Sequence, residues 1–293
     1  MKTILLATAL VIALIAVIVY RLDRPQLNTI DAMVPQDFPP DGFSHRLFED
    51  LLKSYVNDAG EVDYEAWHDS SDDNRQLDSY LAAVSAYSPD NAPDRFESRN
   101  DALAYWLYAY NAYVIRSVLD HWPLQSVTDV QAPVEFVTGF GFFYRQQYVF
   151  GGDSYSLLAV ENQKIRATYK DARIHFVLNC ASESCPVLRP ELPTGDALES
   201  LLQEATLEFV SDERNVYIDH ASKTIFLSTI FKWFKKDFVS ELRKRGLPTE
   251  GGAVAYIASV ADPEKRDALL SAIDYDVKYR DYDWSLNNDD SRL

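Results

Sequence analysis

The reactive side chains of this 293-residue sequence are concentrated in one short segment. Residues 171–189 have the sequence DARIHFVLNCASESCPVLR and contain both cysteines of the protein, Cys180 and Cys185, together with His175. Imidazole and thiol groups at such spacing are suited to disulfide formation, nucleophilic catalysis or metal binding. A candidate functional site is therefore predicted around these three residues.

Four interpretations of the two cysteines are open. A disulfide between Cys180 and Cys185 would close a six-residue loop and stabilise the fold by about 2 kcal/mol. Alternatively, one thiol is a nucleophile that His175 activates as a general base and that Asn179 or a carboxylate helps to orient. The three residues could also bind zinc with Glu161 or water as the fourth ligand, although zinc motifs usually place cysteines closer together. The fourth interpretation is a pair of inert, buried thiols. We favour the disulfide and predict no metal site.

The residues before Cys180 predict a short strand over residues 174–179. Side chains alternate along a strand, so His175 and Asn179 would share one face while the apolar residues between them face the core. Both polar side chains are then directed towards a cleft.

A helix is predicted over residues 157–169, and it carries Glu161 and Arg166. Glu161 follows Leu157, Leu158 and Val160, so burial is expected to raise its pKa. The Arg166 guanidinium could bind a ligand carboxylate or pair with one of the many local acids.

The rest of the chain predicts a helix-rich α+β fold: a single domain with a small antiparallel sheet. Apolar residues at helical spacing predict helices, strongest over residues 99–121, and alternation predicts strands and a hairpin. The predicted helices also include residues 43–55 and 77–87, and the predicted strands are 142–150, 216–219 and 224–227.

The N-terminal region predicts a membrane attachment. Residues 4–20 are apolar except for Thr8 and are flanked by Lys2, Arg21 and Arg24, which is typical of an uncleaved signal-anchor or transmembrane helix. The predicted organisation is a membrane segment (1–24), a proline-rich linker (25–42), an N-terminal helical part (43–98), a core domain (99–210) and a C-terminal extension (211–293).

Composition narrows the classes of function. The chain has a net charge of -17 and 47% hydrophobic residues, which is typical of an acidic globular protein and argues against nucleic acid as a partner. There is no glycine-rich dinucleotide or phosphate-binding motif and no G-x-S-x-G nucleophile elbow. No cofactor is predicted.

Several separated blocks resemble the family known as domain of unknown function 547. They are AYWLYAYNAYVI (104–115), YSLLAVENQKIR (155–166), RIHFVLNCASESCPVLR (173–189), LSTIFKWFKKDF (227–238) and YDWSLN (282–287). The sequence departs from the family pattern at two positions. Tyr108 stands where the helix often carries an additional asparagine. Asn162 stands where a histidine is common, and an amide cannot titrate in its place. The resemblance implies no reaction and no substrate, but it marks positions that include Trp106, Tyr110 and Asn111.

The favoured hypothesis is a noncatalytic module outside the cytoplasm that binds a peptide, a glycan or an envelope partner. In this hypothesis the disulfide stiffens the loop, and Arg166, Arg189, Trp106, Tyr110 and Asn111 contact the ligand. The membrane would be contacted through the N-terminal helix.

The alternative hypothesis is a thiol-dependent hydrolase or acyltransferase. Cys180 or Cys185 would be its nucleophile, His175 its base, and Asn179 or Glu161 the orienting group. It requires at least one free thiol with a low pKa.

Overall fold

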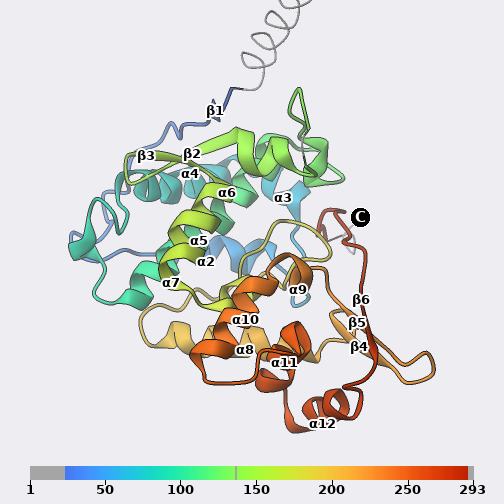
Figure 1. Cartoon of the computed structure of the whole chain (residues 1–293). Helices are drawn as coiled ribbons and strands as arrows, with labels where there is room; N and C mark the ends of the chain where they lie inside the picture. Colours follow the sequence, from blue (N-terminus) through green and yellow to red (C-terminus); the bar gives the residue numbers. More distant parts are fainter. Residues whose placement is uncertain (1–23, 136, 290–293) are drawn as a thin grey trace, which may run out of the picture.

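The structure is a computed structural model that describes residues 24–135 and 137–289 (Figure 1). It is an α+β structure with about 49% helix and two small sheets. One hydrophobic cluster extends from Phe48 to Leu286, so segments far apart in the sequence share a core.

Eleven α-helices are formed by the described residues, and shorter 3-10 and π turns connect some of them. The α-helices are α2 (Arg46–Tyr55), α3 (Tyr64–Asp69), α4 (Ser71–Ala86), α5 (Arg99–Asp120), α6 (Leu157–Ala159), α7 (Ala167–Tyr169), α8 (Ala197–Ser211), α9 (Ile230–Trp233), α10 (Lys235–Lys244), α11 (Gly252–Val260) and α12 (Pro263–Ser271). The π turns are η3 (Gly141–Arg145) and η4 (Val160–Arg166), and the 3-10 turns are η1 (Pro93–Arg95), η2 (Val127–Asp129) and η5 (Ala172–Phe176).

Two three-stranded sheets lie on different sides of the molecule, with the helices α5 and α6 between them (Figure 1). In the first, β2 (Gln146–Phe150) pairs in parallel with β1 (Gln26–Leu27) and antiparallel with β3 (Asp153–Ser156). In the second, β5 (Thr224–Leu227) pairs antiparallel with β4 (Val216–Asp219) and in parallel with β6 (Asp276–Tyr279). The predicted hairpin over 216–227 is confirmed, with Val216 opposite Leu227.

The predicted fold class is wrong in two respects. There are two sheets of mixed direction in place of one small antiparallel sheet, because β1 and β6 come from distant parts of the chain and add a parallel neighbour to each hairpin. The folded domain was also predicted to follow an N-terminal transmembrane helix. Within 24–135 and 137–289, no helix is both long and apolar enough to cross a membrane. Residues 4–20, which carried that prediction, lie outside the described residues.

The strand predicted over residues 174–179 is also wrong. Residues Ala172–Phe176 form the 3-10 turn η5, whose start is capped by the Asp171 side chain accepting the Arg173 N–H at 2.9 Å. The backbone beyond it is held by a side chain: Asn111 donates to the Val177 carbonyl and accepts from the Asn179 N–H. These two groups are therefore unavailable for pairing with a neighbouring strand.

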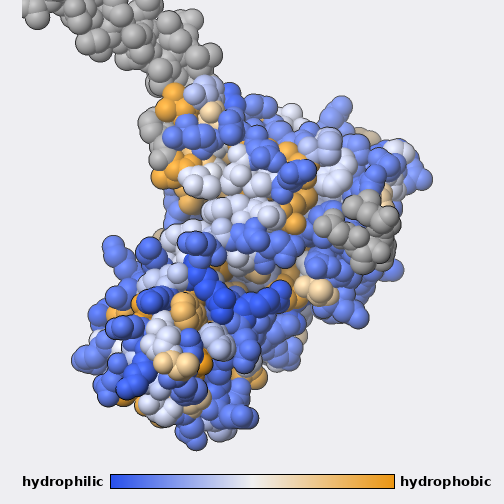
Figure 2. Space-filling view, turned by 90° about the vertical axis from the view of Figure 1, so that its right-hand side faces the viewer, coloured by the Kyte–Doolittle hydropathy of each residue, from blue (hydrophilic) through white to orange (hydrophobic). Residues whose placement is uncertain are grey.

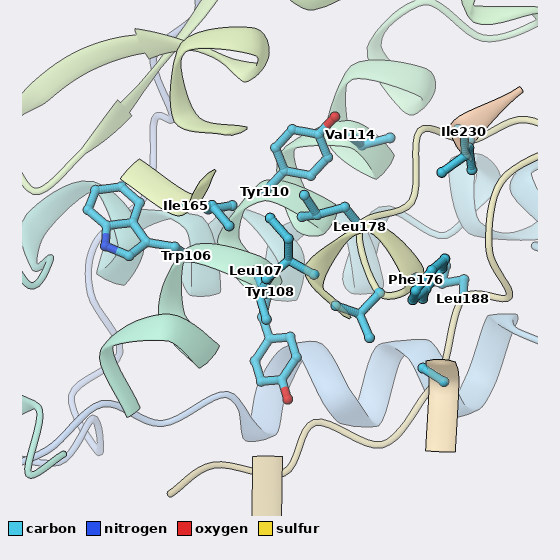
Figure 3. Packing of buried hydrophobic residues seen from close by; sticks show 14 of the residues in the cluster. Trp106, Leu107, Tyr108, Tyr110, Val114, Ile165, Phe176, Leu178, Leu188 and Ile230 are labelled. Atoms are coloured by element: carbon cyan, nitrogen blue, oxygen red, sulfur yellow. The ribbon is translucent and has the colours of Figure 1, made fainter. Parts of the chain in front are cut away.

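Helix α5 is the centre of the structure. A capping box of Ser98 and Asp101 starts it, and nearly all residues from Leu103 to Leu119 are buried. A helix that is apolar on all sides is expected to be buried, and helices α4 and α8 and the turn η4 pack around it. Figure 3 shows Tyr110 of α5 close to Leu178, on the side of the cluster away from Trp106.

The exterior is mainly polar. On the face shown in Figure 2, hydrophilic side chains predominate and the hydrophobic residues form small separate groups. Four of the large exposed hydrophobic side chains, Val137, Tyr144, Leu158 and Trp233, line one cavity.

Candidate functional site

An open cavity of about 430 Å³ brings together side chains from parts of the chain that are far apart in the sequence. Tyr110 comes from α5, Glu161 from η4, His175 from η5 and Trp233 from α9. Its other walls are the segment before β2 and the C-terminal segment. The remaining lining residues are Val137, Thr138, Gly139, Phe140, Phe143, Tyr144, Leu158, Leu178, Cys180, Cys185, Pro186, Ile230, Phe234, Tyr282 and Trp284. Eight of the lining side chains are aromatic, so the cavity is mainly apolar with a few polar groups, as small-molecule and peptide pockets are.

His175 is held by a carboxylate on a distant helix. Its Nε2 lies 2.8 Å from Oδ2 of Asp237 on α10, and its ring stacks on Phe234 with the centroids 3.8 Å apart. Burial lowers the pKa of His175, while Asp237 opposes the shift. The neutral ring therefore donates from Nε2 and keeps Nδ1 as an acceptor, and no hydrogen bond from the described residues reaches Nδ1.

Asp237 also accepts a hydrogen bond from Nε of Arg166 at 2.7 Å. Burial raises the pKa of Asp237, but the hydrogen bonds from His175 and Arg166 outweigh it and lower the pKa to about 2. Arg166, Asp237 and His175 thus form one hydrogen-bonded chain behind the cavity wall. It has the orientation of a carboxylate–imidazole pair that can bind or move a proton.

Glu161 is the acidic group of the cavity wall. Burial raises its pKa to about 7; the nearby Arg166 charge opposes this shift and Asp237 adds to it. Within the part of the chain that the structure describes, no hydrogen bond reaches its carboxylate. Glu161 is therefore half-protonated near neutral pH and presents either a donor or a charge to a ligand.

Cys180 and Cys185 form a disulfide, with their Cα atoms 6.2 Å apart. Both residues are partly exposed and line the cavity. Of the four interpretations open from the sequence, the structure therefore shows the favoured one. No group of three His, Cys, Asp or Glu side chains in 24–135 or 137–289 is placed to hold a metal ion.

Asn179 and Asn111 support the loop instead of lining the cavity. Asn179 is buried, its Nδ2 donates to the Pro186 carbonyl at 2.8 Å and its Oδ1 accepts from the Ala181 N–H at 2.8 Å. Asn111 Oδ1 accepts from the Asn179 N–H at 2.9 Å, and Asn111 Nδ2 donates to the Val177 carbonyl at 3.0 Å. The two amides hold the disulfide loop on helix α5.

Three other predicted ligand-binding residues lie elsewhere. Trp106 is buried and packs near Phe150, with ring centroids 5.9 Å apart. Arg166 stands behind the wall, with its guanidinium 4.8 Å above the Phe234 ring. Arg189 forms an ion pair with Glu208. The structure thus places His175, Glu161, Cys180, Cys185 and Tyr110 together, and their roles remain predictions.

A second, smaller cavity of about 220 Å³ lies next to the first. Cys185, Pro186 and Tyr282 line both cavities, so the disulfide stands at their boundary. The walls of the smaller cavity are mainly polar and charged, and Arg189 is one of them.

Sequence reasoning did not identify Asp237, Tyr282 or the aromatic wall formed by Trp233, Phe234 and Trp284. A signal for them was present, because all five lie within the C-terminal blocks at 227–238 and 282–287. Their chemistry was hidden because an isolated carboxylate in a chain with 45 acids is not distinctive.

The comparison with protein families agrees with the resemblance found in the sequence. Residues 93–210 match the family described as "Protein of unknown function, DUF547", which is the family that the sequence blocks resemble. This range contains Tyr110, Glu161, His175 and the disulfide, while Asp237 and the C-terminal aromatic residues lie beyond it. No curated protein and no solved structure was found to match the chain.

Proposed function

We propose that the protein is a noncatalytic binding module that takes an apolar side chain of a peptide partner into the aromatic cavity. The observation that carries this proposal is the open cavity of about 430 Å³ with its eight aromatic walls. Aromatic side chains dominate the energetics of many binding sites because each contributes a large apolar area at a low entropic cost.

The chemistry of the walls favours a peptide over a glycan. A sugar presents many hydroxyl groups that need hydrogen-bond partners, and the polar side chains of this cavity are few. An aromatic or aliphatic side chain needs none. Glu161 is placed to accept a hydrogen bond from the peptide backbone or to pair with a cationic group beside the anchor.

The disulfide supports two further parts of the proposal. It withholds the free thiol that a thiol-dependent hydrolase or acyltransferase would require, so the alternative function is not the one that this structure supports best. Disulfides also persist mainly in oxidising compartments, which supports a location outside the cytoplasm.

The proposal predicts that Trp233→Ala weakens binding with little effect on folding. Trp233 is 47% exposed and packs against Tyr282 and Trp284 with tilted rings, whose centroids are 4.7 Å and 5.8 Å away. Removing this wall is expected to weaken binding of the neutral fluorescent probe N-phenyl-1-naphthylamine about thirtyfold, which corresponds to the loss of about 2 kcal/mol at a hot-spot aromatic residue. The measurement is a fluorescence titration, followed by displacement of the probe with peptide and glycan libraries.

Tyr217→Ala is the matched control, because Tyr217 is an aromatic residue of β4 that is 38% exposed and lies outside the cavity. This control should bind the probe as the unchanged chain does. Equal affinities of the two variants for the probe would count against the cavity as the binding site. Displacement of the probe by glycans alone would show that the ligand is a glycan and not a peptide.

A further inference from the structure

The disulfide is accessible from two sides. Cys185 lines both the aromatic cavity and the smaller polar one, and Cys180 lines the aromatic cavity. A purely structural disulfide in a folded core would be screened from such contact. This one can be reached by a thiol that enters either cavity.

Three hydrogen-bond donors surround the two sulfur atoms. The Cys180 N–H donates to Sγ of Cys185 at 2.9 Å. The Tyr282 hydroxyl lies 2.9 Å from Sγ of Cys180 and 3.2 Å from Sγ of Cys185, and the Ser182 hydroxyl lies 3.1 Å and 3.4 Å from the same atoms. Disulfide sulfur carries no hydrogen, so in each hydroxyl–sulfur contact the hydroxyl is the donor. The Ser182 and Tyr282 hydroxyls also lie 3.0 Å apart, and each has a single hydrogen that reaches one acceptor at a time.

Such donors stabilise a thiolate more than a disulfide. Neutral disulfide sulfur is a weak acceptor, whereas the negative charge of a thiolate makes its hydrogen bonds considerably stronger. Burial raises the pKa of Tyr282, so its hydroxyl stays protonated and keeps its donor hydrogen at neutral pH. The Cys180 backbone N–H, which donates to Sγ of Cys185, cannot rotate away, and this singles out the Cys185 sulfur as the better site for the charge.

The donors are held by contacts that do not depend on the disulfide. Asn179 joins the two sides of the loop through Ala181 and Pro186. The C-terminal segment adds three backbone hydrogen bonds, from the Glu183 N–H to the Ser285 carbonyl, from the Ser184 N–H to the Asp283 carbonyl and from the Asn287 N–H to the Ala181 carbonyl. The loop is therefore expected to keep its shape when the bridge opens.

We propose that Cys180–Cys185 is a thiol–disulfide exchange centre that oxidises a dithiol, with Cys185 as the leaving thiolate. One thiolate of the dithiol attacks Sγ of Cys180. A mixed disulfide forms, the Cys180–Cys185 bond breaks, and its electron pair passes to Sγ of Cys185. The second thiol of the dithiol then displaces Cys180 and closes the new disulfide.

Two electrons thus pass from the dithiol to the cysteine pair. Of the two protons that the dithiol releases, one is taken up by Cys180 and the other enters the solvent, since Cys185 remains a thiolate. A pair of cysteines in a peptide and a small-molecule dithiol present the same reacting group.

Charged groups around the pair do not cancel the effect of the donors. Glu183 and Asp283 flank it and would raise a thiol pKa, but both are exposed, where water screens their charge. Arg280, which also lines the smaller cavity, acts in the opposite sense. Across the aromatic cavity, His175 is neutral near pH 7 and Glu161 is half-ionised.

The experiment uses the full chain in its folded state. Dithiothreitol should open the bridge without denaturant. Alkylation of the reduced protein by iodoacetamide, followed by mass spectrometry across pH, should then show a Cys185 thiol pKa at least one unit below the ordinary value of about 8.5. Tyr282→Phe and Ser182→Ala should each raise that pKa, because each removes one donor.

Tyr279→Phe is the control, since Tyr279 lies in the same C-terminal region and its hydroxyl does not contact the sulfurs. Circular dichroism checks folding, and Ser182→Ala alone decides the outcome if Tyr282→Phe does not fold. Reduction only in urea, a Cys185 pKa of 8.5 or above, or equal pKa values in the donor variants and the control would each overturn the proposal. Binding of the fluorescent probe is measured separately, so loss of exchange does not imply loss of ligand binding.

Discussion

Replacing Asn111 by alanine is expected to lower the free energy of unfolding by about 4 kcal/mol. Asn111 is buried and makes two hydrogen bonds to the loop, to the Val177 carbonyl and from the Asn179 N–H. Alanine would leave both backbone groups buried without partners, and each such group costs about 1–3 kcal/mol. Urea unfolding followed by circular dichroism measures the loss.

Tyr108→Phe is the control for Asn111→Ala on the same helix. It removes a single hydrogen bond, from the Tyr108 hydroxyl to the Pro193 carbonyl at 2.6 Å, and should cost about 1 kcal/mol. If Asn111→Ala cost no more than Tyr108→Phe, the two amides would not be what holds the disulfide loop on α5.

The second large effect is the pH dependence of Glu161→Gln. The folded-state pKa of Glu161 is raised from 4.5 to about 7, so the folded protein holds a proton that the unfolded chain releases near pH 4.5. This contribution to stability is complete at low pH and is lost as the pH rises from about 4.5 through 7. At about 1.4 kcal/mol per pKa unit, the loss amounts to roughly 3 kcal/mol.

Glutamine stays neutral at every pH, so Glu161→Gln does not lose this stability as the pH rises. Its stability relative to the unchanged chain should increase by about 3 kcal/mol between pH 4 and pH 8.5, as measured by urea unfolding across that range. Burial lowers the pKa of His45 to about 3, so this residue changes the stability with pH in the opposite sense. His45 is present in both proteins, so its contribution cancels when the stability of the unchanged chain is subtracted from that of Glu161→Gln.

Glu65→Gln provides the comparison for an exposed glutamate on a helix. Its effect should be small at every pH. A difference between Glu161→Gln and the unchanged chain that did not vary with pH would show that Glu161 titrates as an ordinary carboxyl and is not part of a desolvated wall.

Local patterns were sufficient to predict several elements of the fold. Helix α5 was predicted because its apolar residues repeat at helical spacing up to Pro123, and the β4–β5 hairpin because two short apolar runs flank a polar turn. The concentration of His175, Cys180 and Cys185 in one segment identified the loop that lies at the cavity. Burial of Glu161 beside apolar neighbours raises its pKa in the predicted direction.

The features that were not predicted depend on long-range packing. The His175–Asp237 hydrogen bond joins residues 62 positions apart, and Tyr282 reaches Cys185 across 97 positions. No local sequence pattern predicts a contact between residues so far apart in the chain. The strand at 174–179 was predicted from alternation alone, but the side chain of Asn111 binds the backbone groups that pairing would use.

The parallel strands β1 and β6 were not predicted for the same reason. Each is short, and β1 has only two residues, so neither shows an alternation that could be recognised. Pairing with a distant hairpin defines both of them. The mixture of parallel and antiparallel strands in each sheet is therefore set by tertiary contacts and not by local sequence preference.

If the aromatic cavity is a binding site, it should bind a small aromatic probe, and NMR can map where that probe binds. Indole is titrated into the isotope-labelled chain, and shifts of backbone amide signals locate it. Saturable shifts are expected to concentrate at Tyr110, Glu161, Leu178 and Trp233, with weaker binding in Trp233→Ala. Shifts concentrated in the smaller polar cavity around Arg214 and Asp281, or no saturable shifts at all, would contradict it.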